Sequence, residues 1–264
     1  MACRQNFGAG GGHKSTNNSS EATAVRKKKE SKQTPIAGLT DRQIQRVRHR
    51  LRRWGRQNYQ SYPWRSDADG WLTFVAEVFL QRTQARQVEK VYREFRKLYP
   101  TPRCLLEADT LELSNLIGAL GLAFRIQLLQ EIARVAVDRN GVLPETIDEL
   151  KSLKGVGMYT AAAWLSLHRG KRAVLIDSNV ARWLSRMTGN PYNRDPRHVS
   201  WIKELAEELT PPRAFRDYNY AVLDFTMQLC TPRKPSCEYC PIRAECVYGS
   251  SLPTKTSSSA APRR

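Results

Sequence analysis

The apolar residues between positions 39 and 248 recur at intervals of three and four, and this pattern constrains the fold more than any other feature. It is the spacing of a helix that buries one face against its neighbours. Segment 42–57 shows it clearly, with seven arginines covering the other faces of the helix, where they meet solvent or phosphates. Its apolar stripe consists of Ile44, Val47, Leu51 and Trp54.

The rest of this region has the same character, and patterns typical of strands are nearly absent. We therefore predict an all-α protein without internal repeats. Further helices are predicted at 71–82, 86–98, 111–117, 125–139, 146–152, 158–168, 178–187, 197–209 and 215–229.

The charge of the chain favours polyanionic partners. Forty-three Lys and Arg residues against 25 Asp and Glu give a formal net charge of +18, which indicates nucleic acid first and acidic membrane surfaces second. No apolar run approaches the ~20 residues that a membrane span needs, and no export signal is evident. Residues 1–38 and 249–264 are expected to be disordered basic tails.

Four of the six cysteines lie close together near the end of the chain, with the spacing C-x6-C-x2-C-x5-C. In a chain without an export signal, this density indicates a metal site rather than disulfides. The compact spacing favours an iron–sulfur cluster, and a structural zinc site is the alternative. The candidate ligands are Cys230, Cys237, Cys240 and Cys246.

Two polar motifs follow one another in the second half of the chain. Between two predicted helices, Gly155-Val156-Gly157 permits a sharp turn whose backbone amides can approach a phosphate. This is either a helix-hairpin-helix clamp for the DNA backbone or an ordinary turn between helices. Asp177 precedes an amphipathic segment, where an aspartate is most often the N-cap of a helix.

A carboxylate interrupts the otherwise apolar run 71-WLTFVAEVFLQRTQ-84. Thr73, Glu77 and Gln81 are spaced by four, so they form one polar stripe on a predicted helix. The stripe faces either solvent or a cavity. We expect the second, with a raised pKa that makes Glu77 a candidate proton donor.

In combination these motifs resemble the helix-hairpin-helix DNA glycosylases with an iron–sulfur cluster, the endonuclease III and MutY superfamily. The resemblance spans about residues 59–248. It implies two helical lobes that bind double-stranded DNA between them: a six-helix barrel of residues 62–171, and a cluster lobe of residues 39–61 and 172–248. The resemblance depends on 62-YPWR-65, 77-EVFLQRTQ-84, 153-LKGVGMYTA-161, 176-IDSNVARWL-184 and 217-DYNYAVLDF-225.

The resemblance also implies roles for single residues. Asp177 matches the catalytic aspartate, which stabilises the oxocarbenium-like sugar or orients the attacking water after the nucleotide is flipped out. Glu77 matches a glutamate with which MutY-type enzymes protonate the departing base. Gln81 matches the residue that fills the gap left by the flipped base. The four cysteines match the ligands of a [4Fe–4S] cluster. The remaining DNA contacts are Leu153, Lys154, Gly155, Val156, Gly157 and Thr160, with Lys154 in place of the usual proline.

Tyr159 occupies the position at which bifunctional members of this family have a lysine. A lysine amine attacks the sugar C1′ and forms a Schiff base, which a phenol cannot do. We therefore predict a monofunctional enzyme that leaves an abasic site.

The sequence indicates the base that is removed less directly than it indicates the family. Glu77 fits removal of adenine opposite 8-oxoguanine, but 118-GALGLAFR-125 lacks the tyrosines usual in those relatives, and the chain ends before their additional C-terminal domain. Segments 177-DSNV-180, 224-DF-225 and 231-TPRKPSC-237 are closer to the mismatch thymine glycosylases. We therefore expect thymine or uracil opposite guanine as the substrate.

Three alternatives stay open: an adenine glycosylase, a non-catalytic DNA-binding protein on the same scaffold, and a basic zinc-containing adaptor. The expected state is a monomer. The expected location is the cytoplasm and nucleoid in a prokaryote, or the nucleus in a eukaryote.

Overall fold

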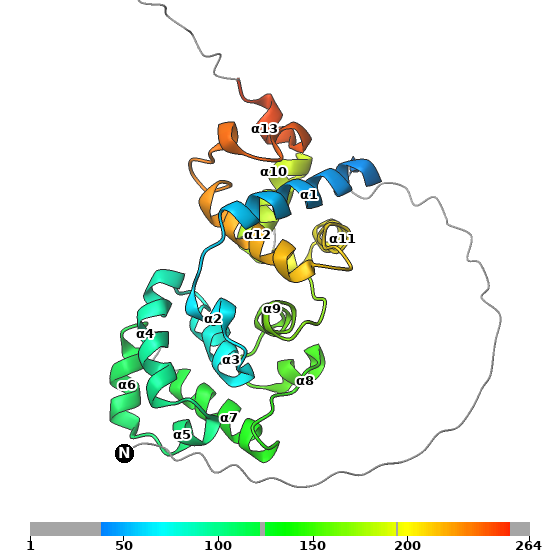
Figure 1. Ribbon diagram of the computed structural model, residues 1–264. Helices are drawn as coiled ribbons and strands as arrows, with labels where there is room; N and C mark the ends of the chain where they lie inside the picture. Colours follow the sequence, from blue (N-terminus) through cyan, green and yellow to red (C-terminus); the bar gives the residue numbers. More distant parts are fainter. Residues whose placement is uncertain (1–37, 122–124, 194, 254–264) are drawn as a thin grey trace, which may run out of the picture. The chain divides into compact units, whose positions relative to one another are not determined.

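The computed structural model describes residues 38–121, 125–193 and 195–253, and within these residues all regular structure is helical (Figure 1). The all-α prediction is confirmed. The predicted N-terminal tail lies almost entirely outside the described residues. The helices are α1 (Asp41–Gln57), α2 (Pro63–Ser66), α3 (Gly70–Phe79), α4 (Ala85–Leu98), α5 (Pro102–Leu106), α6 (Thr110–Gly118), α7 (Arg125–Asp138), α8 (Ile147–Ser152), α9 (Met158–His168), α10 (Ser178–Thr188), α11 (Ser200–Leu209), α12 (Phe215–Gln228) and α13 (Val247–Ser251), with short 3-10 turns at Pro196–His198, Cys237–Tyr239 and Arg243–Glu245.

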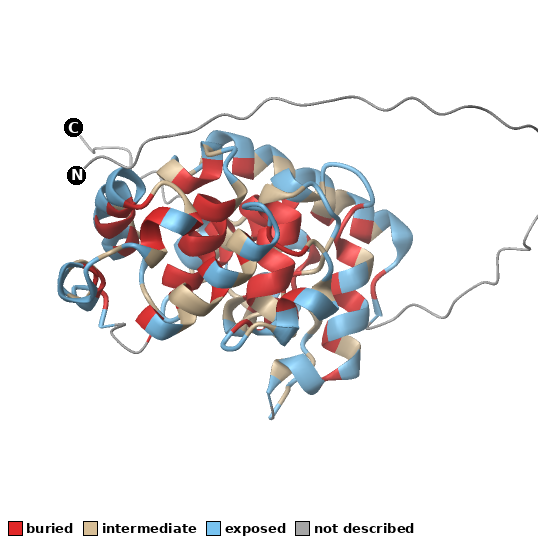
Figure 2. Cartoon of the chain, turned by 90° about the horizontal axis from the view of Figure 1, so that it is seen from below, coloured by how far each residue is buried: buried red, intermediate tan, exposed pale blue. Residues whose placement is uncertain are grey.

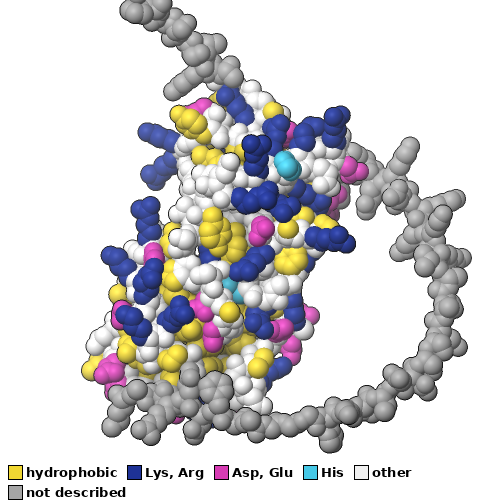
Figure 3. Space-filling view, viewed as in Figure 1, with side chains coloured by type: hydrophobic (Ala, Val, Ile, Leu, Met, Phe, Trp, Pro, Cys, Tyr) yellow, Lys and Arg dark blue, Asp and Glu magenta, His cyan; other side chains and the backbone are white. Residues whose placement is uncertain are grey.

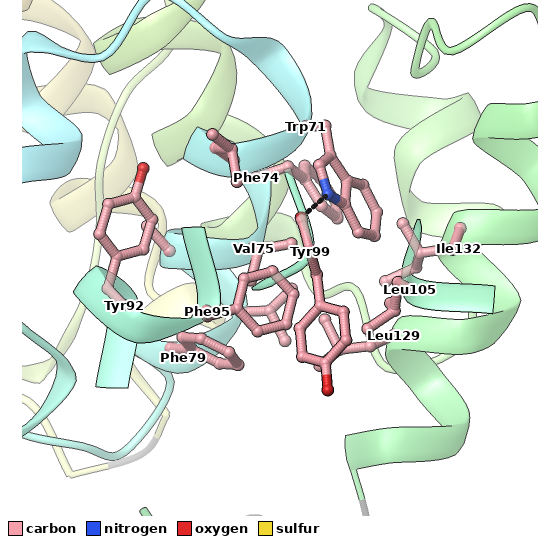
Figure 4. Packing of buried hydrophobic residues seen from close by; sticks show 14 of the residues in the cluster. Trp71, Phe74, Val75, Phe79, Tyr92, Phe95, Tyr99, Leu105, Leu129 and Ile132 are labelled. Carbon is pink, nitrogen blue, oxygen red and sulfur yellow. Dashed lines mark hydrogen bonds between the residues drawn. The ribbon is translucent and has the colours of Figure 1, made fainter. Parts of the chain in front are cut away.

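One hydrophobic core is built by helices α3 to α9. Its aromatic residues pack edge to face, as Phe79 does on Phe95 and Phe74 on Trp164. Figure 4 shows the side of this core at which the indole of Trp71 donates a hydrogen bond of 3.3 Å to the carbonyl of Tyr99. Buried residues lie on the inner faces of the helices and exposed residues on the outer faces (Figure 2).

A second hydrophobic core is built by α1 together with α10, α11 and α12. Ile44, Val47 and Leu51 are buried in it, as the periodicity of their segment predicts. Helix α1 runs along α12 at very close range, because a Cβ atom on Gly55 would lie only 2.4 Å from the Cβ of Ala221. The glycine therefore permits the close approach of these two helices.

Several arginines of α1 form ion pairs and hydrogen bonds within the protein. Arg46 and Arg50 both pair with the buried carboxylate of Glu245, at 2.9 and 3.1 Å. Arg48 donates to the carbonyl oxygen of Leu209 at 3.2 Å, and so ties α1 to the end of α11. Some of the positively charged side chains of the chain therefore stabilise the packing around the second core.

The two cores are joined by buried contacts. Arg65 from α2 and Asp224 from α12 form a two-pronged ion pair with N–O distances of 2.7 and 2.8 Å. Helix α9 contacts α12 through a small cluster that includes Leu167 and Tyr220. The predicted lobe boundaries at residues 61 and 171 stay a prediction.

Two local expectations need correction. Helix α3 ends at Phe79, so Gln81 lies in the following turn and not on the helix. Helix α13 continues to Ser251, so the predicted C-terminal tail begins too early; residues 254–264 lie outside the described part. No helix among the described residues is long and apolar enough to span a membrane.

Candidate active site

The polar stripe of α3 faces α9. Thr73 accepts a hydrogen bond from the indole nitrogen of Trp164 at 3.2 Å. One turn later, Glu77 Oε1 lies 3.0 Å from Nε2 of His168, with both side chains buried at 6% and 1% exposure. The stripe therefore does not face solvent, and Glu77 is a buried carboxylate held by an imidazole.

His168 is a site residue that the sequence did not indicate. It is the last residue of α9, whose apolar residues surround the helix and leave no stripe to show which side faces a site. The only available signal was that one of just four histidines in the chain ends an apolar segment.

Gln81 is held by hydrogen bonds to its side chain and to its backbone carbonyl. Its amide Nε2 donates to Thr160 Oγ1 at 3.0 Å and to the carbonyl of Gly155 at 3.4 Å. The buried guanidinium of Arg125 binds the carbonyls of Val78 and Gln81. The turn after α3 is therefore held against the hairpin that precedes α9.

Tyr159 lies within electrostatic range of both candidate carboxylates. Burial raises the pKa of its phenol well above the ordinary value, and the charges of Asp177 and Glu77 raise it further. Two carboxylates that are 100 residues apart in sequence therefore act electrostatically on the same buried side chain. At neutral pH the phenol keeps its proton, so it can donate a hydrogen bond but cannot act as a nucleophile.

Asp177 is the N-cap of α10 and also belongs to this site, so the two interpretations of this residue are compatible. Its Oδ1 accepts the N–H of Val180 at 2.7 Å, and its Oδ2 accepts from Asn179 Nδ2 at 3.0 Å. Asn179 in turn accepts from Arg182 at 2.9 Å. The positive end of the helix favours the negative charge of the carboxylate, which these bonds also orient.

The hairpin between α8 and α9 has the conformation that its glycines predict. Gly155 has a φ of +75° and lies against the side chain of Leu128, so any Cβ at this position is disfavoured twice. Val156 is buried and its N–H donates to the carbonyl of Leu153. Within the described residues, the N–H groups of Gly155 and Gly157 make no such bond and lie at the exposed side of the turn.

The four cysteines line one cavity, together with apolar residues such as Trp183, Phe225 and Ile242. The backbone N–H of Gly249 donates to Cys246 Sγ at 3.3 Å, and Arg186 Nη1 lies 3.6 Å from Cys230 Sγ. Burial, followed by the neighbouring thiols, raises the pKa of Cys240 to about 12. No three His, Cys, Asp or Glu side chains in the described part converge as ligands of a single ion.

Residues 75–212 match the family described as "HhH-GPD superfamily base excision DNA repair protein". The chain belongs to this superfamily. The resemblance inferred from the motifs is therefore confirmed, and the Gly155–Gly157 turn is the hairpin of an HhH-GPD protein.

Several proteins similar to this HhH-GPD chain are DNA glycosylases. A thymine/uracil-DNA glycosylase from Methanothermobacter thermautotrophicus is 35% identical over 191 residues, which cover 72% of this chain and 86% of that protein. The solved structure of a thermostable thymine-DNA glycosylase superposes with a TM-score of 0.75 at 32% identity, covering 80% of this chain and 99% of that one. An adenine DNA glycosylase from Rattus norvegicus is 31% identical over 245 residues, but only 47% of that protein is covered.

Proposed function

We propose that this chain is a monofunctional DNA glycosylase that removes thymine or uracil opposite guanine from double-stranded DNA. The observation that supports this most directly is that the charges of Asp177 and Glu77 both act on the buried, neutral phenol of Tyr159. The similarity to thymine/uracil-DNA glycosylases along most of their length supports the choice of base.

The reaction breaks the bond between the sugar C1′ and the base N1 of a flipped nucleotide. The bonding electrons leave with the pyrimidine, whose charge is spread to its carbonyl oxygens, while the sugar becomes positively charged. The oriented carboxylate of Asp177 stabilises that positive charge. A water oxygen then bonds to C1′ and passes its proton to a carboxylate, which leaves an abasic site.

Tyr159 supports the monofunctional assignment. A Schiff base requires an amine beside C1′, and a protonated phenol in this position forms no such intermediate. Two roles are open to Glu77: a proton donor to the departing base, or an acceptor that orders the attacking water.

DNA is bound through the hairpin, the turn after α3 and the basic surface. The backbone amides of Gly155 and Gly157 hold a phosphate at the start of α9, and the exposed Lys154 adds a positive charge beside them. Gln81 fills the space that the flipped nucleotide leaves. Lys and Arg side chains lie over both groups of helices on the face shown in Figure 3, which suits a long stretch of DNA backbone.

We also propose that Cys230, Cys237, Cys240 and Cys246 hold a [4Fe–4S] cluster. Four thiols around one cavity, with Arg186 and a backbone N–H directed at two of the sulfurs, are donors that suit thiolate ligands. When bound, the cluster supplies a structural cross-link of the segment from Cys230 to Cys246. Iron and acid-labile sulfide in a ratio of one to one, without zinc, is the expected analysis; stoichiometric zinc contradicts the proposal.

The substrate is tested with duplexes that contain T·G, U·G, A·8-oxoG or A·G, incubated with the full chain and then cleaved with alkali. We expect strand cleavage of the T·G and U·G duplexes after alkali only. Cleavage confined to the adenine duplexes overturns the proposal in favour of an adenine glycosylase, which the similarity to the rat protein and the presence of Glu77 favour as second candidate.

Asp177→Asn tests the catalytic carboxylate with little change in shape, because asparagine is also a good N-cap. We expect the single-turnover rate to fall by at least about 100-fold with DNA binding retained. Asp109→Asn is the matched control, since Asp109 is the exposed N-cap of α6 and lies outside the site. An unchanged rate for Asp177→Asn removes this residue from the mechanism.

A further inference from the structure

The buried histidine beside Glu77 has an unusual environment. His168 Nε2 lies 3.0 Å from Glu77 Oε1, and this is the one hydrogen bond of the imidazole among the described residues. The other ring nitrogen, Nδ1, is fully buried without a partner in the same part of the chain. A histidine buried this deeply in an active site, and bonded only to a catalytic carboxylate, is more than a filler of space.

The unpartnered Nδ1 indicates where the proton of the pair lies. A protonated Glu77 that donates to Nε2 requires a proton on Nδ1, and so does a positively charged imidazolium. Either state places an N–H on Nδ1, which has no acceptor among the described residues. A neutral imidazole whose single proton lies on Nε2 avoids this and donates its hydrogen bond to Glu77 Oε1.

The other groups that face Glu77 are consistent with this state. The charge of Glu77 contributes to raising the pKa of Tyr159, after burial and Asp177, and that of Tyr220, after burial. Both phenols therefore remain protonated at neutral pH and present O–H donors. Tyr159 of α9 and Tyr220 of α12 thus lie within electrostatic range of Glu77, and Asp177 of α10 is the other carboxylate that acts on Tyr159.

We propose that His168 is a positioning residue that holds Glu77 as a hydrogen-bond acceptor, so that Glu77 orders and deprotonates the attacking water rather than protonating the base. The imidazole fixes Oε1, while Oε2 has no hydrogen-bond partner among the described residues and is available to the water. The water oxygen bonds to C1′, its proton moves to Oε2, and the base leaves with the electrons of the C1′–N1 bond. This inference rests on the proposed glycosylase function.

Three substitutions separate this role from simple packing. His168→Gln places an amide N–H near the position of Nε2, whereas His168→Asn is too short to reach Glu77 and His168→Leu has no donor. We expect the Asn and Leu variants to lose roughly 10-fold or more in single-turnover excision, with the Gln variant restored to within a few-fold of wild type and DNA affinity unchanged in all three.

Ser166→Ala is the control for a purely structural effect. Ser166 lies on the same helix and accepts a buried hydrogen bond of 2.6 Å from Asn219, away from Glu77. We expect this variant to lose thermal stability but not excision rate. If His168→Leu and Ser166→Ala reduce stability alike and neither changes the rate, His168 is only structural and the proposal is overturned.

A double-mutant cycle tests whether His168 acts through Glu77. In a Glu77→Gln background, His168→Leu should cause little further loss of rate, because the group that it positions is already disabled. Full additivity of the two losses contradicts a positioning role.

Nuclear magnetic resonance of the imidazole nitrogens gives a readout without any substrate. The expected pattern is a proton on Nε2 and none on Nδ1 at neutral pH, with an Nε2–H proton resonance that shifts in Glu77→Gln. A protonated Nδ1 overturns the proposal even in an active enzyme. Conversely, the expected pattern in a protein that cuts none of the duplexes supports the His168–Glu77 arrangement while the proposed function fails.

Discussion

The ion pair between Arg65 and Asp224 gives the sharpest test of how the two cores are held together. It joins α2 to α12 with side-chain exposures of 7% and 3%. Burial alone would lower the pKa of the Arg65 guanidinium, but the hydrogen bonds and charge of Asp224 outweigh it and raise the pKa. The guanidinium also lies 4.5 Å from the ring centre of Tyr220, a residue within electrostatic range of Glu77.

Asp224→Asn keeps the size of the side chain and removes its charge. The change leaves a buried cation without a counter-ion and turns an N–H₂ group toward one of its nitrogens. Breaking a buried pair in this way costs about 3–5 kcal/mol of unfolding free energy. This is a large part of the ~5–15 kcal/mol by which a folded domain is stable.

Urea unfolding followed by circular dichroism measures this loss directly. The double variant Arg65→Met, Asp224→Leu removes both charges together, and we expect it to recover most of the loss because well-packed apolar residues replace a buried pair at little net cost. The control is Glu94→Gln, which breaks the exposed pair with Lys97 and should cost less than about 0.5 kcal/mol.

Two outcomes contradict this account of the Arg65–Asp224 pair. A loss in Asp224→Asn no larger than that of the Glu94→Gln control means that water or a rearranged side chain solvates Arg65. A double variant that is less stable than Asp224→Asn means that the geometry of the pair, and not the unpaired charge, dominates.

Two further predictions concern α1 and the lyase step. Gly55→Ala should destabilise the protein by about 1–3 kcal/mol in the same unfolding assay, because the new Cβ would lie 2.4 Å from that of Ala221. This loss should outweigh the better helix propensity of alanine. The control is Gly118→Ala, where the added Cβ meets open space, and equal effects at both sites refute the close contact. Tyr159→Lys should produce a DNA adduct that borohydride traps, because it places an amine within electrostatic range of both candidate carboxylates; the absence of any adduct in a variant that still excises the base argues that this position lies away from C1′.

The helices could be predicted from the sequence because most of them bury one stripe and expose the rest. The stripe of Ile44, Val47 and Leu51 is buried as expected. The arginines on the other faces of the same helix could not be assigned, since Arg46 and Arg50 depend on a carboxylate almost 200 residues away, at Glu245.

Only some residues of the candidate site could be predicted from the sequence. Asp177, Glu77 and Tyr159 could be selected because their motifs occur together, and the structure brings them together. His168 could not, because its bond to Glu77 spans 91 residues and the helix that carries it is apolar on every side. The position of Gln81 beyond the end of α3 could not be predicted either. There, the side chain of Arg125 from α7 binds the carbonyls of Val78 and Gln81.

The cysteine segment and the candidate catalytic carboxylate of Asp177 belong to one hydrogen-bonded framework. Arg182 donates to the carbonyls of Thr226 and Cys230 at about 3.0 Å, and its other nitrogen donates to Asn179. Asn179 then donates to Asp177, whose second oxygen caps the same helix from which Arg182 projects. The backbone position of Cys230 is therefore linked to the orientation of Asp177 through two side chains.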